Sequence, residues 1–142
     1  MQIRLPDGYG MFVEEVGGGF PLVVLHGGPG LDHTQFRPWL DPLGDEFRLL
    51  YVDERGQGLS ERVDPETLSL EVFARDVDLL AEALGLDRFA LLGHSFGAIV
   101  TTWHATEVVA PERAKSDHAP AQTDRHRATS SWITGRSGSV SR

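Results

Sequence analysis

The sequence predicts an α/β fold in which a mostly parallel sheet carries helices on its faces. Three apolar runs, residues 21–25, 47–52 and 88–92, have the composition of buried strands, and glycine motifs follow them. Between the second and third runs, apolar residues recur at the three- and four-residue steps of an amphipathic helix. Buried strands that alternate with helices indicate a parallel sheet with both faces covered.

The chain is expected to begin with a hairpin. Residues 2–5 and 10–16 flank the turn-forming tripeptide Pro6-Asp7-Gly8. The run at 21–25 follows as the first buried strand. Next, residues 33–43 are predicted to form one short helix whose apolar face consists of Phe36, Trp39 and Leu40.

A longer helix is predicted between the strands at 47–52 and 88–92. Either Asp64-Pro65 or Ser69 can cap its N-terminus, and Gly85 is suited to end it. Its apolar face is predicted to consist of Leu70, Phe73, Val77, Leu80 and Leu84.

The most informative segment follows the last apolar run. It reads Gly93-His94-Ser95-Phe96-Gly97, and a Gly-x-Ser-x-Gly turn between a strand and a helix is typical of a nucleophile elbow. The tight turn strains the backbone of the serine, and the glycines remove Cβ atoms that would collide. Ser95 is therefore the candidate catalytic nucleophile. The pattern alone is weak, and the alternative is a glycine-rich turn with an incidental serine.

A second glycine-rich loop could stabilise the negative charge that develops in acyl transfer. This loop is His26-Gly27-Gly28-Pro29-Gly30. The tetrahedral intermediate needs N–H donors for its oxyanion. One expected donor is the amide after the nucleophile, Phe96, and the other comes from this loop, with Gly28 preferred over Gly27. An ordinary strand-to-helix turn is the alternative.

Four further residues are expected to position these loops. Asp53 and Arg55 follow the run at 47–52, and holding their loop by ion pairs and hydrogen bonds is preferred over substrate contact. His26 lies in the oxyanion loop and His94 in the elbow, so both are assigned the same positioning role.

Taken together, the motifs resemble the N-terminal half of an α/β-hydrolase. The resemblance covers residues 1–110 and includes Asp-x-Arg-Gly-x-Gly-x-Ser between the two glycine motifs. The form His-Gly-Gly-Pro-Gly is similar to the prolyl iminopeptidase group, which releases N-terminal proline from peptides. The resemblance implies Ser95 as nucleophile and a sheet truncated after about its fifth strand. Ala98, where many members carry glycine, is a minor departure.

The catalytic acid and base that the resemblance implies are not evident. In this fold they follow the serine in the order Asp or Glu, then His, but only 47 residues follow Ser95. His118 and His126 could serve as a displaced base, but a disordered segment cannot hold a base against the serine. We therefore expect the chain to be weakly active or inactive.

Composition divides the chain near residue 110. Residues 1–110, the N-terminal half of a hydrolase domain, hold 7 Arg and 18 acidic residues, whereas residues 111–142 hold 6 basic and 3 acidic residues. This tail has one aromatic residue and no strand or helix period, so it is predicted to be disordered or frame-shifted. A native divergent tail is the alternative.

Composition also excludes several classes of protein. The net charge of −8 argues against nucleic-acid binding. The lack of cysteine excludes disulfides and fits a reducing compartment. No apolar signal or membrane-length run is present, which indicates a cytoplasmic protein. No metal or other cofactor is expected, and the expected partner is a small-molecule or short-peptide substrate, with the oligomeric state left open.

Two classes of function remain. The first is a serine hydrolase, related to aminopeptidases that release N-terminal proline or else an esterase or amidase of the same fold. A serine nucleophile excludes members that use aspartate, such as epoxide hydrolases. The second is a non-catalytic remnant that binds small acyl compounds or a partner.

Overall fold

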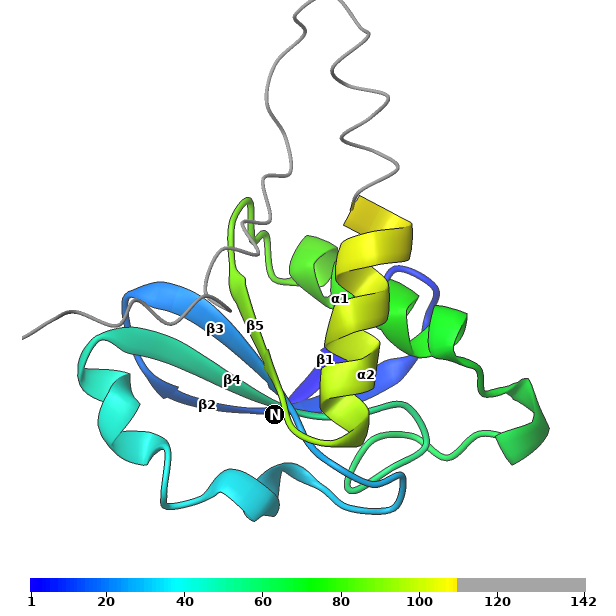
Figure 1. Cartoon of the computed structure of the whole chain (residues 1–142), viewed down its shortest axis with the longest axis horizontal. Coiled ribbons are helices and arrows are strands. Elements are labelled where there is room, and N and C mark those ends of the chain that lie inside the picture. The colour runs from blue at the N-terminus through cyan, green and yellow to red at the C-terminus, as the bar shows by residue number, and fades with distance from the viewer. Residues whose placement is uncertain (110–142) are drawn as a thin grey trace, which may run out of the picture.

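The computed structural model describes residues 1–109 and contains one five-stranded sheet with the order β1-β2-β4-β3-β5. Strands β3 and β4 are parallel, as are β3 and β5, whereas β2 pairs antiparallel with both β1 and β4. Figure 1 shows the strands fanning across the molecule. The strands are β1 (Gln2–Arg4), β2 (Gly10–Gly17), β3 (Phe20–Leu25), β4 (Phe47–Asp53) and β5 (Ala90–Gly93). The predicted α/β fold class is confirmed.

Helices cover both faces of this sheet. Helices α1 (Leu70–Ala83) and α2 (Phe96–Trp103) pack on one face, and α2 continues into the π-helical turn η4 (His104–Val109). The short 3-10 helices η1 (His33–Phe36) and η2 (Asp41–Asp45) pack on the other face (Figure 1). A further 3-10 turn, η3 (Pro65–Thr67), precedes α1.

Alternation along β3 divides the core between the two faces. Val23 and Leu25 belong to the larger cluster, which contains residues of α1 and α2. Leu22 and Val24 belong to the smaller cluster on the opposite face. Successive side chains of a strand point to opposite faces, so a strand buried on both sides must be apolar at every position.

The prediction of one helix over residues 33–43 was wrong. The chain forms η1 and η2 instead, with Arg37 between them in an extended conformation, φ −97° and ψ 140°. Arg37 precedes Pro38, and the proline ring disfavours helical geometry at the residue before it. Phe36 and Leu40 still pack on the smaller cluster, but Trp39 is 79% exposed and does not share their buried face.

The predicted features of α1 are largely confirmed. Ser69 is its N-cap and accepts a hydrogen bond from the backbone N–H of Val72, whereas Asp64 caps η3. Of the predicted apolar face, Phe73, Val77 and Leu80 are buried, and the flanking leucines pack against the same cluster. The residue after the C-cap, Gly85, has φ 63°, a conformation that favours glycine.

The predicted tail, residues 111–142, lies outside the described residues. Within residues 1–109, no helix has both the length and the apolar character that a membrane crossing requires.

Candidate functional site

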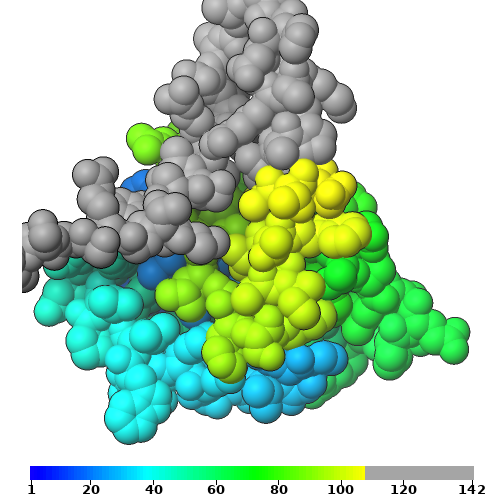
Figure 2. All heavy atoms as spheres, viewed as in Figure 1, coloured from blue at the N-terminus to red at the C-terminus, as the bar shows by residue number. Residues whose placement is uncertain are grey.

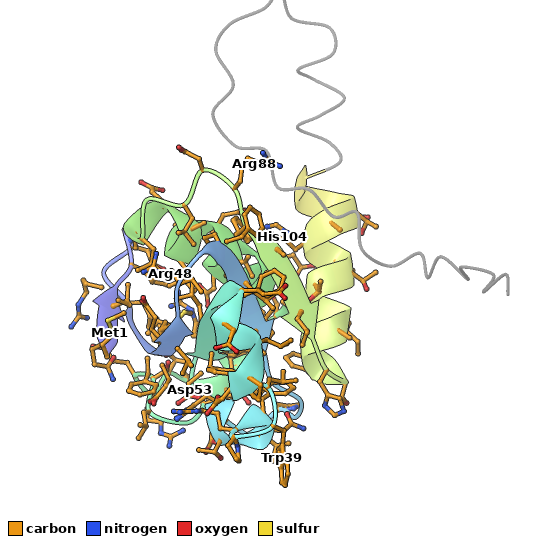
Figure 3. The ribbon with its side chains drawn as sticks, turned by 90° about the vertical axis from the view of Figure 1, so that its left-hand side faces the viewer. Met1, Trp39, Arg48, Asp53, Arg88 and His104 are labelled. Carbon is orange, nitrogen blue, oxygen red and sulfur yellow. The ribbon has the colours of Figure 1, made fainter. Side chains whose placement is uncertain are left out.

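The site lies where the parallel strands end. Because β3, β4 and β5 run in the same direction, the loops after them meet at one edge of the sheet. In Figure 3, Asp53 at the end of β4 and Trp39 lie toward one end of the molecule, and Arg88, before β5, lies toward the other. Figure 2 shows the start of α2 on the surface beside the segment that follows β3. Ligands of open α/β sheets bind at this kind of edge.

Ser95 occupies the strained turn between β5 and α2. Its φ is 52° and its ψ is −111°, and no other non-glycine residue in the described part of the chain has a positive φ. The side chain is exposed, and the residue caps α2 without using its hydroxyl. Backbone strain of this kind persists only where surrounding contacts hold it.

The two glycines of the motif provide those contacts. A Cβ on Gly93 would collide with the carbonyl of Gly97. A Cβ on Gly97 would lie 2.6 Å from the carbonyl oxygen of His26 and would also strike that of Leu25. The N–H of Gly97 donates to the His26 oxygen at 3.0 Å, and that of His94 donates to the Leu25 oxygen at 3.1 Å. The elbow is therefore packed directly on the end of β3.

Gly97→Ala is expected to destabilise the fold by roughly 3 kcal/mol, because the new methyl group meets backbone atoms that cannot rotate away. Urea unfolding followed by circular dichroism measures this change. Gly18→Ala is the matched control, because a Cβ at Gly18 meets nothing within 4 Å. A Gly97→Ala variant as stable as the control would contradict the close approach of α2 to β3.

Some backbone N–H groups around Ser95 already donate a hydrogen bond within the protein, and others do not. The Gly97 and Ala98 amides donate within the elbow, whereas Phe96 donates to no group in residues 1–109. In the loop after β3, the Gly27 amide donates to Oε1 of Gln35 at 2.7 Å, and Gly28 has no acceptor in the same range. The backbone N–H groups of Phe96 and Gly28 are thus available to a ligand, whereas that of Gly27 is already bonded to Gln35.

His26 determines the direction of the Gly28 amide. Its imidazole is fully buried, and its Nε2 accepts a hydrogen bond from the backbone N–H of Glu54 at 3.2 Å. Its Nδ1 therefore carries the proton and donates to the carbonyl oxygen of Gly27 at 2.7 Å. In a trans peptide, the C=O and the following N–H point in opposite directions. Holding the Gly27 carbonyl therefore fixes where the Gly28 N–H points.

Asp53 connects the loops after β3 and β4. Its buried carboxylate accepts from the backbone N–H of His33 at 2.7 Å and from His33 Nδ1 at 2.8 Å. Its other oxygen accepts from the Leu59 N–H at 2.8 Å. Both carboxylate oxygens are thus engaged inside the protein.

Arg55 lies in an ion-pair cluster on the helix side of the sheet. It donates to Asp76 at 2.6 and 2.8 Å and to Asp7 at 2.8 Å, and its guanidinium lies 3.9 Å from the ring centroid of Tyr9. These hydrogen bonds raise the pKa of Arg55, so the side chain remains charged. The contacts link the loop after β4 to α1 and to the β1–β2 turn.

The prediction from sequence did not identify Glu54, whose carboxyl group is buried and has His26 Nδ1 at 3.6 Å from its Oε2. Its side chain is 4% exposed, and neither carboxyl oxygen has a hydrogen-bond partner within residues 1–109. It lines a cavity of about 10 Å³ together with Asp76 and apolar residues of β3, β4 and α1. Burial, with a smaller contribution from the charge of Asp76, raises the pKa of Glu54 to about 8. A neutral carboxylic acid therefore lies beside His26, at the start of the glycine-rich loop after β3, at pH 7.

Two glutamines were also missed. Gln35 Oε1 accepts from Gly27, and its Nε2 lies 3.0 Å from Nδ1 of His94. Gln57 Oε1 accepts from the Gly30 N–H at 2.5 Å. Gln35 belongs to η1 and Gln57 to the loop after β4, and both accept hydrogen bonds from backbone N–H groups of the glycine-rich loop.

One group of side chains has the geometry of metal ligands but is occupied by internal contacts. Donor atoms of Asp32, His33 and Asp53 lie within 4.8 Å of one another. The ring of His33 hydrogen-bonds Asp53, and Asp32 accepts from the N–H and hydroxyl of Thr34 as the cap of η1. These contacts account for the cluster without an ion.

The hydroxyl of Ser95 has no hydrogen-bond partner within residues 1–109. None of the hydrogen bonds in this range involves its Oγ, and the neighbouring His94 uses Nδ1 toward Gln35. The described residues thus contain an exposed serine and two available amides, and no base in contact with that serine.

Comparisons with known proteins agree with this architecture. The family model for the alpha/beta hydrolase fold matches residues 21–116. The proline iminopeptidase of Clostridioides difficile (strain 630) is 36% identical over 101 residues, which cover 70% of this chain and 34% of that protein. A soluble epoxide hydrolase from Corynebacterium sp. (strain C12) is 35% identical over 100 residues, with the same coverage.

The solved structures include a proline iminopeptidase-related protein from Thermus thermophilus. It is 37% identical, has a TM-score of 0.70, and is matched over 77% of this chain and 40% of its own. The chain spans about a third of the length of the curated relatives named above.

Proposed function

This chain belongs to the α/β-hydrolase fold family, and we propose that it carries the nucleophile and the oxyanion hole of a serine hydrolase. The observation that carries the proposal is the geometry of Ser95, an exposed side chain on a strained turn at the start of α2. Ser95 attacks the substrate carbonyl, and the amides of Phe96 and Gly28 stabilise the oxyanion that forms.

Three further residues position the loops of the site in this proposal. His26 directs the Gly28 amide, and Asp53 holds the loop that follows β3 against the loop that follows β4. Arg55 connects the loop after β4 to α1. These roles require no metal or other cofactor.

The proposed substrate class is a peptide or amide with an N-terminal proline. Support comes from the His-Gly-Gly-Pro-Gly form of the oxyanion loop and from the similarity to proline iminopeptidases. An esterase or amidase of the same fold is the second candidate. Similarity to an epoxide hydrolase is weaker support for function, because the resemblance implies an aspartate at the elbow of such enzymes, where this chain has Ser95.

A hybrid hydrolase tests the chemistry. Residues 1–109 are joined to the C-terminal remainder of the Clostridioides difficile proline iminopeptidase, which by family resemblance brings the acid, the base and the substrate-recognising cap. The hybrid is expected to hydrolyse proline p-nitroanilide. Because the donor half supplies everything else, turnover reports on the elbow and the oxyanion loop of this chain. A folded hybrid without turnover would contradict the proposal.

The 142-residue chain itself is expected to be barely active on proline p-nitroanilide and p-nitrophenyl acetate. No base contacts Ser95 within residues 1–109, and a serine without such a base remains a neutral alcohol of low nucleophilicity. The oxyanion donors leave a residual acceleration, which in triad-depleted serine proteases is roughly a thousandfold over water. Rapid turnover that is lost in His118→Ala or His126→Ala would instead place the base beyond residue 109.

Substrate class needs a separate observation, since the donor half of the hybrid brings its own cap. The coding DNA beyond residue 109, translated in all three frames, is expected to encode an Asp and a His in one frame, in the order of the family. The cap encoded in that same frame would then be tested on proline anilides and on esters. A cap that accepts esters alone would favour the second candidate.

A further inference from the structure

Gln35 lies between the two loops that form the proposed oxyanion hole. It belongs to η1, and its carboxamide contacts the glycine-rich loop with one atom and the elbow with the other. Oε1 is 2.7 Å from the Gly27 nitrogen, and Nε2 is 3.0 Å from His94 Nδ1. A Cβ added to Gly27 would lie 2.9 Å from His94 Nδ1 and 3.3 Å from the Gln35 amide. The three groups are therefore packed in direct contact.

The protons in this chain of contacts can be assigned in only one way. A backbone N–H can only donate, so the Gln35 atom that faces Gly27 must be the oxygen. The other end of the carboxamide is then NH₂, which donates to His94 Nδ1. His94 Nδ1 must be the unprotonated nitrogen, so the ring proton is on Nε2.

We propose that Gln35 is a positioning residue that couples the oxyanion loop to the nucleophile elbow, an inference that rests on the proposed function. The peptide between His26 and Gly27 is held at both ends. Its N–H donates to Gln35, and its carbonyl oxygen accepts from Gly97 in the elbow. The next peptide carries the Gly28 donor. Fixing the first peptide, together with the His26 ring, therefore fixes the distance between the Gly28 and Phe96 amides.

The hydrogen bonds of the sheet do not connect the glycine-rich loop to the turn that contains Ser95. Strands β3 and β5 pair as far as Leu25 with Gly93, and the ladder ends there. Beyond that point, the Gln35 bridge and the contacts of Gly97 connect the two loops. Gln35 is the part of this connection that comes from a third element, on the opposite face of the sheet from α2.

Histidine-ring NMR of the ¹⁵N-labelled 142-residue chain tests the proton assignment. In the wild type, His94 is expected to show an unprotonated Nδ1 and a protonated Nε2. Gln35→Glu replaces the donating NH₂ by a carboxylate oxygen, so the proton is expected on Nδ1. Gln35→Leu removes both contacts, and mixed tautomers are expected. Observation of a protonated Nδ1 in the wild type would overturn the proposal, whether or not any hydrolase activity exists.

Amide hydrogen exchange of Gly27 tests the contact of Gln35 Oε1 independently of the contact of its Nε2 with His94. Gln35→Leu is expected to speed exchange of the Gly27 N–H about five- to tenfold, the loss of one hydrogen bond. Gln35→Glu keeps an acceptor and should leave that rate unchanged while it switches the His94 tautomer. Gln2→Leu and Gln2→Glu are matched controls, because Gln2 lies in β1 and its amide donates to the Leu59 carbonyl, away from Gly27 and His94. Equal changes in the controls would overturn the assignment.

The hybrid hydrolase gives the functional readout. Gln35→Leu is expected to lower kcat roughly tenfold and leave KM within about twofold, because misplaced oxyanion donors weaken the transition state more than the ground state. An unchanged kcat with the NMR signatures intact would overturn the coupling role and leave Gln35 as a purely structural contact. Loss of turnover in the parent hybrid would instead count against the proposed function, and the NMR result would stand independently.

Discussion

Ser95→Ala is expected to lower kcat of the hybrid hydrolase by roughly a millionfold, the loss seen when the nucleophile of a serine hydrolase is removed. The expectation follows from the strained, exposed position of the residue and from the lack of any other nucleophile on the same turn. Removing the hydroxyl leaves the backbone in place, so the oxyanion donors and the fold should persist. Initial rates with proline p-nitroanilide, measured for both proteins at the same concentration, give the ratio.

A matched control separates chemistry from folding. Ser69→Ala removes another serine hydroxyl, the cap of α1, and is expected to cost about 1 kcal/mol of stability with unchanged kcat. Thermal unfolding of Ser95→Ala should match that of the parent hybrid. If Ser95→Ala retains more than a hundredth of the parent activity, the nucleophile lies elsewhere and the reaction has been assigned to the wrong residue.

Glu54→Gln is expected to remove a pH-dependent destabilisation of roughly 5 kcal/mol. The ordinary pKa of this carboxyl is 4.5, and burial raises the pKa of Glu54 to about 8 in the folded chain. Below pH 4.5, both the folded and the unfolded states are protonated, and the group has no effect. As the pH rises to 8, only the unfolded state releases the proton, so folding stability falls. Above pH 8, the penalty stays constant.

Urea unfolding of the 142-residue chain at about pH 5, 7 and 9 measures the effect. Glutamine has the same shape without the charge. The free energy of unfolding of the variant, relative to that of the wild type, should therefore increase steadily up to about pH 8. Glu82→Gln, an exposed carboxylate on α1, is the control and should run parallel to the wild type. Parallel curves for Glu54→Gln would show that the buried carboxyl is compensated by a partner.

The sequence predicted the parts of the fold that local pattern determines. Apolar runs located β3 and β4 and the core of β5, and the Gly-x-Ser-x-Gly motif placed Ser95 at a strand-to-helix turn. The short helix failed because Pro38 and Pro42 divide residues 33–43, and a helical spacing of apolar residues does not register that interruption.

The supporting residues of the site depend on contacts between distant segments. Gln35 has no signature in its own segment, because its role requires both His94 and Gly27 to fold against it. Glu54 could have been found from sequence, since it continues the alternation of Leu50 and Val52 toward the face of the sheet that α1 and α2 cover. The preference for Gly28 over Gly27 was already made from sequence, but its structural reason could not have been found, because the Gly27 N–H is engaged by that same glutamine.

The position of β5 at the edge of the described sheet governs when the site can assemble. Within residues 1–109, this strand pairs with β3 alone, through the four residue pairs from Leu22–Ala90 to Leu25–Gly93. A ribosome releases the oxyanion loop long before it makes the elbow, so the Gly28 amide stays without its partner loop until β5 docks. Long-range pairing of this kind forms late, because loop closure must come first. We therefore expect Ser95, the proposed nucleophile, to reach its position beside the glycine-rich loop only after β5 has docked on β3.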